Sequence, residues 1–330
     1  MYCQRARRAY YGNNRFVREM GMEQYVRFKT KGAFKRQLKK SIPGWIFILP
    51  MLFGICVFTL YPMVQSIMYS FHDYDMITKY DFVGFGQYVK LFKDPVIIKA
   101  ITNTFLFSII NVPMMIVLTY LLAIVLNSKL PGIKAFRVIY YLPCVIPAIA
   151  GGIVWSAIMK SGTEAPGIFN QLRDLLGIKP SLYFYSRNFE SIRSILVMNI
   201  WGVGSGVITW IAAFQNIPEQ LYEAAKIDGA NKFVQLFRIT VPLSAPMLLY
   251  NLITLLITNL QFSGTLTFAP NMGAGYDNST LFLGVKIYNE AFRRLNIGYA
   301  AALSWVLLII TAIFTAITFK INKVTDNGAY

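Results

Sequence analysis

Residues Gln220 to Pro242 read QLYEAAKIDGANKFVQLFRITVP and form a polar stretch between two apolar segments of the chain. Most of the remaining sequence is apolar, since hydrophobic residues make up 55% of the 330 residues, charged residues only 14%, and the mean hydropathy is +0.48. This balance is typical of membrane proteins. The fold therefore depends on the apolar segments on either side of the stretch.

Six apolar runs are long enough to cross a bilayer as helices, which takes about 20 residues each. The first three contain Pro50, Pro62, Pro113, Pro143 and Pro147, where we expect kinks because proline has no backbone N–H. The sequence thus predicts an all-α membrane protein with six transmembrane helices. The predicted spans cover about Gly44 to Phe71, Ile101 to Leu126, Phe136 to Met159, Ile192 to Phe214, Pro246 to Phe262 and Gly298 to Ile321.

The distribution of Lys and Arg orients these spans, because short cytoplasmic segments carry an excess of positive charge. Residues 1 to 40 hold twelve Lys and Arg against two acidic residues, which supplies +10 of the formal net charge of +17. The loop after the second span adds basic residues without an acid, and the tail carries Lys320 and Lys323 against Asp326. We therefore expect both termini in the cytoplasm.

The sequence predicts three regions: a basic cytoplasmic segment at 1–41, the six-helix domain at 42–322 and a cytoplasmic tail at 323–330. The charge of the first region lies directly beside the first span and is interleaved with aromatic residues. This pattern favours anionic membrane lipid over nucleic acid as its partner.

Chemistry-bearing motifs are absent from the sequence. Cys3, Cys56 and Cys144 share no short spacing, and His72 is the only histidine, so a metal site or a Ser-His-Asp relay has little to build on. Neither a phosphate-binding G-x-x-x-x-G-K-[ST] loop nor a Gly-rich dinucleotide fingerprint occurs. We expect no enzymatic activity, no metal and no cofactor bound by this chain.

The polar stretch falls in the predicted cytoplasmic loop between the fourth and fifth spans. Pro218 suits the first turn of a helix, and Gly229 suits the left-handed residue that ends one. Asn231 can cap a second helix, which we expect to run through Arg238 and to stop by Pro242, because the residue before a proline disfavours helix. The loop is thus predicted to form a helix, a Gly turn and a second helix.

Small and apolar side chains line one face of the first helix in this loop, about 215–245. Leu221, Ala225 and Asp228 share that face, and small residues let a partner protein approach closely. Glu223 can accept a charge-assisted hydrogen bond from a basic residue of such a partner. An amphipathic loop resting on the inner leaflet explains the same pattern, so these residues alone leave both interpretations open.

The order of residues in the loop resembles the EAA loop in permease subunits of ATP-binding-cassette importers. The family pattern is E-A-A, a Gly four residues after the second Ala, and an I-x-L-P ending. The chain has Glu223-Ala224-Ala225, then Gly229, and then Ile239-Thr240-Val241-Pro242, with Val in place of Leu. The resemblance implies the type I importer permease fold.

Weaker matches extend the resemblance from about Ile42 to Asn322 and point to the carbohydrate-type branch of these importers. Residues Phe82 to Tyr88, FVGFGQY, are similar to its F-V-G-L-x-N-Y segment, and Gly167 to Asn170 match its G-x-x-N. The family usually has a T-x-G-G-P turn after the fifth helix, whereas Thr267 to Gly275 read TFAPNMGAG. We therefore expect a different shape for this outer loop.

The resemblance also implies partners and a location. Such a multi-pass subunit of the bacterial plasma membrane pairs with a second permease, receives substrate from an extracytoplasmic solute-binding protein and is driven by two cytoplasmic ATPase subunits. ATP and Mg bind to those ATPases, whose closure the EAA loops transmit as a rigid-body motion. The residues implied to couple this chain to an ATPase are Glu223, Ala224, Ala225, Asp228, Gly229 and Pro242.

A sugar or an oligosaccharide is the implied substrate, and its recognition requires amide groups and aromatic faces in an interior cavity. Amides are costly when they face lipid, so we expect those in the spans to point inward, although many amides only tie helices together. The family's sugar contacts fall in the fifth span. The predicted path residues are Asn251, Asn259, Gln261, Phe262 and Trp201.

An ion-coupled secondary transporter or a channel subunit is the alternative function. Such proteins usually need ionisable residues inside their spans. This chain has very few there, since Arg137 and Arg193 lie at span ends. The ATP-driven importer is therefore the favoured prediction.

Overall fold

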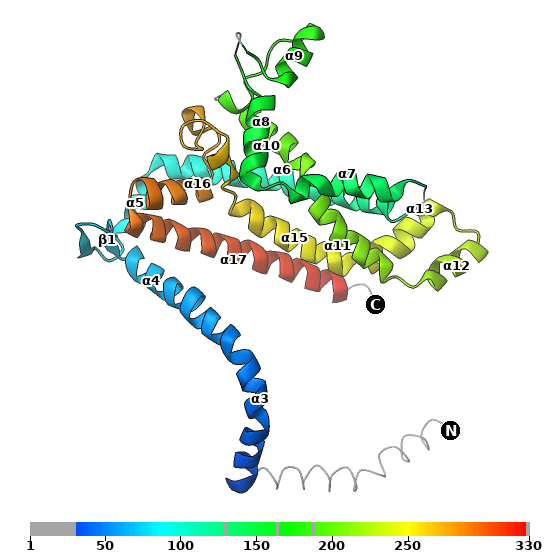
Figure 1. Cartoon of the computed structure of the whole chain (residues 1–330), viewed down its shortest axis with the longest axis horizontal. Coiled ribbons are helices and arrows are strands. Elements are labelled where there is room, and N and C mark those ends of the chain that lie inside the picture. Colours follow the sequence, from blue (N-terminus) through cyan, green and yellow to red (C-terminus); the bar gives the residue numbers. More distant parts are fainter. Residues whose placement is uncertain (1–30, 129–130, 163–164, 187–188, 328–330) are drawn as a thin grey trace. The chain divides into compact units, whose positions relative to one another are not determined.

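α-Helices form most of this computed structural model (Figure 1). The chain divides into two units, Met1–Gln65 and Ser66–Tyr330. The two termini, which are predicted to be cytoplasmic, lie outside the described residues. The structure describes residues 31–128, 131–162, 165–186 and 189–327.

The described part of the first unit is a continuous helical run. α3 (Lys31–Ile55) passes into a π-turn, η1 (Cys56–Leu60), and then into α4 (Tyr61–Ser70), which continues into the second unit. The amide of Tyr61 bonds to the carbonyl of Cys56, five residues earlier. Pro62 follows at once and has no N–H, so the wider π-turn accommodates it without ending the helix.

Among the described residues, three helices are long and apolar enough to cross a membrane on their own: Gly44–Ser70, Pro95–Leu126 and Ile297–Ile321. Three further segments pass the same test only as pairs of helices, bent by 98°, 50° and 64° at short breaks. The described residues thus hold up to six crossing segments. All six predicted spans fall on apolar helices. The bend in the third follows the predicted kink at Pro147, whereas no break was predicted in the fourth and fifth. The bent pairs are Ala135–Val145 with Ala148–Ile158, Glu190–Trp201 with Gly204–Gln215, and Lys232–Leu243 with Ala245–Leu260.

The sharpest of these breaks has a local cause. α7 (Ile133–Val145) and α8 (Ala148–Ile158) are separated by Ile146 and Pro147, both of which have extended ψ angles. The residue before a proline avoids the helical region, so the chain turns at this point. In contrast, Pro113 does not interrupt its helix, α6.

The long helices of the second unit run beside one another (Figure 1). α6 (Pro95–Leu126) packs against α11 (Gly204–Gln215) and α15 (Ala245–Leu260), and α15 packs against α17 (Ile297–Asn327). α10 (Glu190–Trp201) joins α11 at the second break. The shorter elements are α9 (Ile168–Leu175), η2 (Tyr183–Tyr185), η4 (Gly264–Thr267), η5 (Tyr276–Asn278), α16 (Leu283–Tyr288) and η6 (Asn289–Arg293).

A short antiparallel hairpin departs from the all-α prediction. β1 (His72–Tyr74) pairs with β2 (Tyr80–Phe82). The carboxylate of Asp75 accepts hydrogen bonds from three backbone amides of the connecting turn at 2.8–2.9 Å. These bonds favour the charged form and hold the pKa of Asp75 well below its usual range.

The FVGFGQY segment joins this hairpin to α5 (Gly86–Lys93). Gln87 is buried, and its side-chain amide donates to the carbonyl of His72 at 3.2 Å. The hydroxyl of Tyr88 donates to Ser70 at 2.9 Å. The segment therefore fixes the hairpin to the end of α4 and the start of α5.

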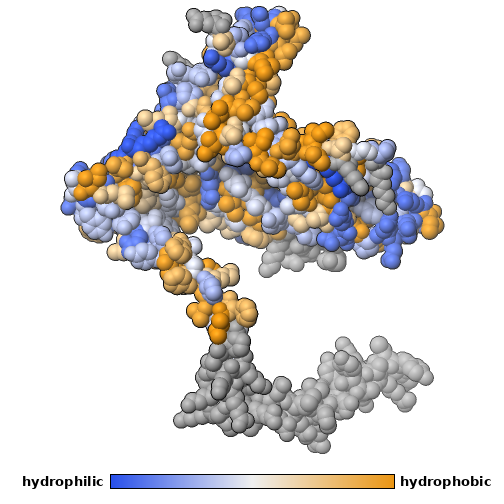
Figure 2. All heavy atoms as spheres, viewed as in Figure 1, coloured by the Kyte–Doolittle hydropathy of each residue, from blue (hydrophilic) through white to orange (hydrophobic). Residues whose placement is uncertain are grey.

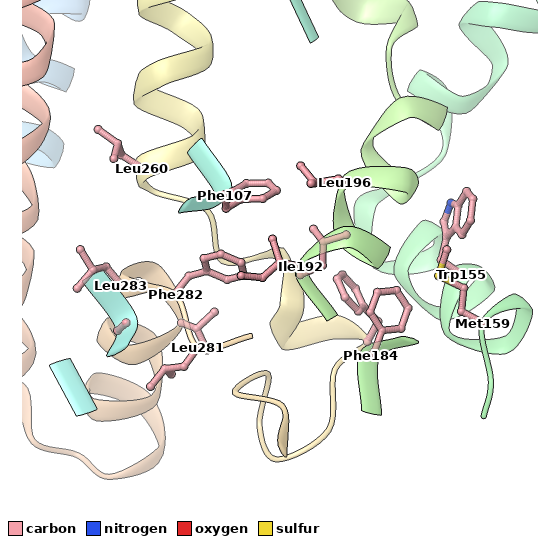
Figure 3. Packing of buried hydrophobic residues seen from close by; sticks show 14 of the residues in the cluster. Phe107, Trp155, Met159, Phe184, Ile192, Leu196, Leu260, Leu281, Phe282 and Leu283 are labelled. Carbon is pink, nitrogen blue, oxygen red and sulfur yellow. The ribbon is translucent and has the colours of Figure 1, made fainter. Parts of the chain in front are cut away.

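The larger apolar core forms where α6, α8, α10 and α16 meet. The ring of Phe107 lies 4.9 Å from that of Phe262 and 5.3 Å from that of Phe282, measured between centroids. Ile192 and Leu196 of α10 belong to the same cluster (Figure 3). Burial of these large side chains supplies much of the packing energy that holds the four elements together.

Candidate functional site

The loop that holds the EAA-like residues begins with a helix and a Gly turn, as predicted. α12 (Glu219–Ile227) ends at a left-handed residue, Gly229, with φ +80°. The amide of Ala230 bonds to the carbonyl of Ala225 at 2.8 Å, and the amide of Gly229 bonds to that of Lys226 at 3.1 Å. A Cβ at Gly229 would meet nothing within 4 Å, so the backbone conformation, not space, requires glycine here.

The second arm of the loop is longer than predicted. The side chain of Asn231 caps it, as expected, by accepting a backbone N–H at 2.9 Å. The prediction that this helix stops by Pro242 is wrong. α13 (Lys232–Gln235), the π-turn η3 (Leu236–Thr240) and α14 (Val241–Leu243) follow one another without a gap.

The π-turn explains how the helix passes the proline. The amide of Val241 bonds to the carbonyl of Leu236, five residues earlier, and Pro242 has no N–H to leave unpaired. The arm ends at Ser244, where the chain bends by 64° into α15. A proline is expected to end a regular α-helix, but a preceding π-turn lets the helix continue. The π-turn η1 does the same before Pro62.

The predicted coupling residues lie on the surface of this loop. Glu223, Ala224, Asp228, Gly229 and Pro242 are exposed, and Ala225 is half-buried. Large apolar side chains are exposed beside them, with Ile227 88% and Phe233 74% accessible. Hydrophilic residues gather over the same end of the unit, around α12 and α13 (Figure 2). The loop thus presents a mixed apolar and charged surface, as protein interfaces do.

The inner side of the loop rests on a second apolar core between α6 and α11. Val207, Trp210 and Phe214 of α11 belong to this core, and Tyr222 and Ile239 of the loop pack against it. The indole N–H of the fully buried Trp210 donates to the hydroxyl of Thr119 on α6 at 3.0 Å. The loop is therefore seated on two long helices.

Two of the predicted path residues bind neighbouring helices in this structure. The side-chain oxygen of Asn259 accepts from the amide of Asn111 on α6 at 2.7 Å. That of Asn251 accepts from Thr209 on α11 at 3.0 Å. The two asparagines are only 5% and 7% exposed. Their hydrogen bonds tie α15 to both neighbours, and contact with substrate stays a prediction.

The two predicted aromatic residues make packing contacts. Phe262 is half-buried beside Phe107 and Phe282. The ring of Trp201 lies edge-on to that of Trp155, with centroids 6.0 Å apart. For both residues, contact with substrate stays a prediction.

Gln261 belongs to an exposed polar stripe on α15. Tyr250, Thr254 and Thr258 are exposed with it, at spacings of four, four and three residues that place them on one helix face. Gln261 borders a groove of about 700 Å³ between α15 and α17. The hydroxyl residues were not among the predicted path residues, although their helical spacing in an apolar segment is visible in the sequence. The polar residues that line the groove from α17 are Ser304, Thr311 and Thr315.

Residues 83–328 match the model of the family described as binding-protein-dependent transport system inner membrane component. The chain belongs to this family. The match includes the EAA-like loop and the grooved α15–α17 pair. Membership confirms the predicted non-catalytic, multi-pass permease component of a binding-protein-dependent importer, and it disfavours the ion-coupled alternative.

Bacterial permeases can be aligned with this chain over most of its length. The lactose transport system permease protein of Rhizobium radiobacter is 34% identical over 88% of this chain and 96% of its own. The diacetylchitobiose uptake system permease protein of Streptomyces coelicolor is 32% identical over 91% and 88%. A crystal structure of a bacterial ABC transporter involved in the import of the acidic polysaccharide alginate contains a chain with a TM-score of 0.78, at 20% identity over 88% and 98%. That likeness shows the type I importer permease fold.

The permease also contains a buried charge network at the end of the unit away from the EAA loop (Figure 1). The ammonium of Lys286 lies 2.9 Å from Glu290 and 3.5 Å from Asp94, and Arg294 lies 2.9 Å from Glu290. The side chains of Lys286 and Glu290 are only 8% and 4% exposed. The hydroxyl of Tyr299 donates to Asp94 at 3.3 Å. The network joins the N-cap of α6 to α16, η6 and α17. The i, i+4 spacing of Lys286, Glu290 and Arg294 is visible in the sequence, but their meeting with Asp94 and Tyr299 is not, because those residues are far apart along the chain.

Nothing in the described part of the chain suggests a metal centre, since no group of three or more His, Cys, Asp and Glu side chains gathers there. The candidate functional surfaces of this permease are the EAA loop and the polar stripe of α15.

Proposed function

We propose that this permease is the translocation subunit of an ATP-driven importer for a sugar or an oligosaccharide, located in a bacterial plasma membrane. It crosses the membrane six times, each bent helix pair forming one crossing, with both termini in the cytoplasm. The names of the lactose and diacetylchitobiose permeases support the substrate class. The observation that carries the proposal is the helix–Gly turn–helix loop seated on α6 and α11.

Two cytoplasmic ATPase subunits, which bind ATP and Mg, a second permease and a solute-binding protein complete the proposed assembly. The exposed face of α12 docks on one ATPase. Glu223 accepts a hydrogen bond from a basic residue of the ATPase, and Ala224 and Ala225 permit close approach. Ile227 and Phe233 supply apolar area that water otherwise covers.

Movement of the ATPase reaches the membrane through the base of the loop. Tyr222 and Ile239 press on the core between α6 and α11, and the second arm leads directly into α15. Packed interfaces move as rigid bodies, so displacement of α12 displaces these helices together. The polar stripe of α15 then changes its access from one side of the membrane to the other.

Reconstitution tests this function. The tagged permease, expressed with the products of its neighbouring genes, is expected to co-purify with ATPase subunits. In liposomes, the complex is expected to take up a labelled oligosaccharide only with ATP and a solute-binding protein present. Uptake by the purified permease alone, driven by an ion gradient without ATP, would establish the secondary-transporter alternative instead.

The polar stripe is the proposed substrate path, and substitutions there are expected to weaken substrate handling. Thr258→Val and Gln261→Leu each remove a group that can bond a sugar hydroxyl, and one such bond contributes about 0.5–1.5 kcal/mol. The KM for uptake should rise by about three- to tenfold in each variant, with ATP hydrolysis maintained. Thr318→Val is the control, because Thr318 lies on α17 outside the stripe and its hydroxyl, like that of Thr258, bonds to a carbonyl of its own helix. An unchanged KM in both variants would exclude the stripe from the path.

A further inference from the structure

A side-chain hydrogen bond joins the two arms of the EAA loop. The hydroxyls of Tyr222 in α12 and Thr240 in η3 lie 2.8 Å apart, although the residues are 18 positions apart in sequence. Thr240 is buried and Tyr222 is half-buried against the core between α6 and α11. Neither residue is a defining letter of the E-A-A, Gly and I-x-L-P pattern.

This bond closes the loop at the end opposite to its Gly turn. At the turn, the backbone bonds of Gly229 and Ala230 hold α12, and the buried amide of Gln235 donates to the carbonyl of Ala230 at 2.9 Å. At the other end, the bond between Tyr222 and Thr240 joins the first helix to the π-turn. The two arms are thus connected at both ends, as a rigid body requires.

Thr240 also lies where the loop meets α15. It is the last residue of η3, and its carbonyl accepts the amide of Ser244 at 3.0 Å, where the chain bends into α15. The hydroxyl of Ser244 lies 3.3 Å from that of Tyr120 on α6. A π-turn has poorer hydrogen-bond geometry than an α-helix, so an added side-chain bond at its end limits its distortion.

We propose that Tyr222 and Thr240 form a positioning pair that makes α12 and the start of α15 move together. This inference rests on the proposed function, in which α12 receives the motion of an ATPase. Without the bond, α12 can swing about the Gly229 turn while the π-turn and α15 stay in place. ATP hydrolysis then continues, but less substrate is taken up for each ATP hydrolysed.

The test compares Tyr222→Phe, Thr240→Val and the double variant in the complete importer. Tyr222→Phe keeps the ring that packs on the core and removes only the hydroxyl. Loss of one hydrogen bond changes an equilibrium by about fivefold, so uptake per ATP hydrolysed should fall by about fivefold in each single variant. ATP hydrolysis and the amount of assembled complex should persist. The double variant should be no worse than the singles, because both remove the same bond.

Matched variants separate this role from a general loss of packing. Thr240→Ser keeps a hydroxyl and should keep normal uptake per ATP. Tyr141→Phe and Thr318→Val remove hydroxyls elsewhere in the chain and should do the same. The pairing is refuted if uptake per ATP is unchanged in the single variants, if their losses add in the double variant, or if Thr240→Ser is as defective as Thr240→Val.

The outcome for the wild-type complex distinguishes this inference from the proposed function. Wild-type uptake that needs no ATP, or a wild-type permease that binds no ATPase, overturns the function and the pairing together. Normal ATP-driven uptake in the wild type with unaffected Tyr222 and Thr240 variants overturns the pairing alone.

Discussion

Gly229→Pro is expected to abolish ATP-driven uptake while the permease remains in the membrane. Gly229 has φ +80°, whereas the proline ring fixes φ near −65°, so the turn after α12 cannot form. The substitution also removes the N–H that bonds to the carbonyl of Lys226 at 3.1 Å. The measurement is ATP-dependent uptake in reconstituted liposomes, with the membrane content of permease determined on the same preparation.

A graded series at the same position checks the physical reason. Gly229→Asn should retain most uptake, because Asn tolerates the left-handed region better than other side chains. Gly229→Ala should lose more, since a Cβ costs roughly 1–2 kcal/mol there. Space does not complicate the comparison, because nothing lies within 4 Å of a Cβ at this site. Unimpaired uptake in both Gly229→Pro and Glu223→Ala would contradict the assignment of this loop to coupling.

Lys286→Met is expected to be the most destabilising single substitution in the charge network. Lys286 lies between Asp94 and Glu290, and its loss leaves two buried or half-buried carboxylates with less neutralising charge. Removing one partner of a buried ion pair costs about 3–5 kcal/mol, because the remaining charge stays out of water. The melting temperature of the purified permease should fall by on the order of 10 °C.

An exposed ion pair provides the control for this substitution. Lys79 lies 3.8 Å from Asp73, and the two side chains are 60% and 40% exposed. Exposed pairs contribute about 0–1 kcal/mol, so Lys79→Met should leave the melting temperature almost unchanged. Equal melting temperatures for the Lys79 and Lys286 variants would show that the network does not stabilise the fold.

Features that depend on short segments could be predicted from the sequence. The apolar segments follow from composition, and the caps of the EAA loop follow from the preferences of Gly229 and Asn231. The break at Pro147 also has a local signal, which predicted a kink without its size. The π-turns at η1 and η3 escaped prediction because they depend on a hydrogen-bond register that proline permits but does not require.

Features that depend on neighbouring helices could not be predicted. Asn251 and Asn259 were expected to point inward, but the helices that they bind, α11 and α6, could not be read from the sequence. The packing against these helices exposes Thr254 and Thr258 on another face. Which face of a helix is buried is decided by tertiary contacts, because a membrane helix can be apolar on all sides. The charge network has the same origin, since Asp94 and Lys286 meet only in the folded chain.

The π-turn η3 has a consequence for the direction in which α15 faces. A π-turn contains one residue more per turn than an α-turn, and each residue of an α-helix adds about 100° of rotation. The extra residue before Pro242 therefore sets the angle at which the next helix begins. Deleting one residue of η3 is expected to change the direction in which α15 begins and to move Gln261 relative to the groove that it borders. Pro242 and its π-turn thus determine the direction in which α15 faces.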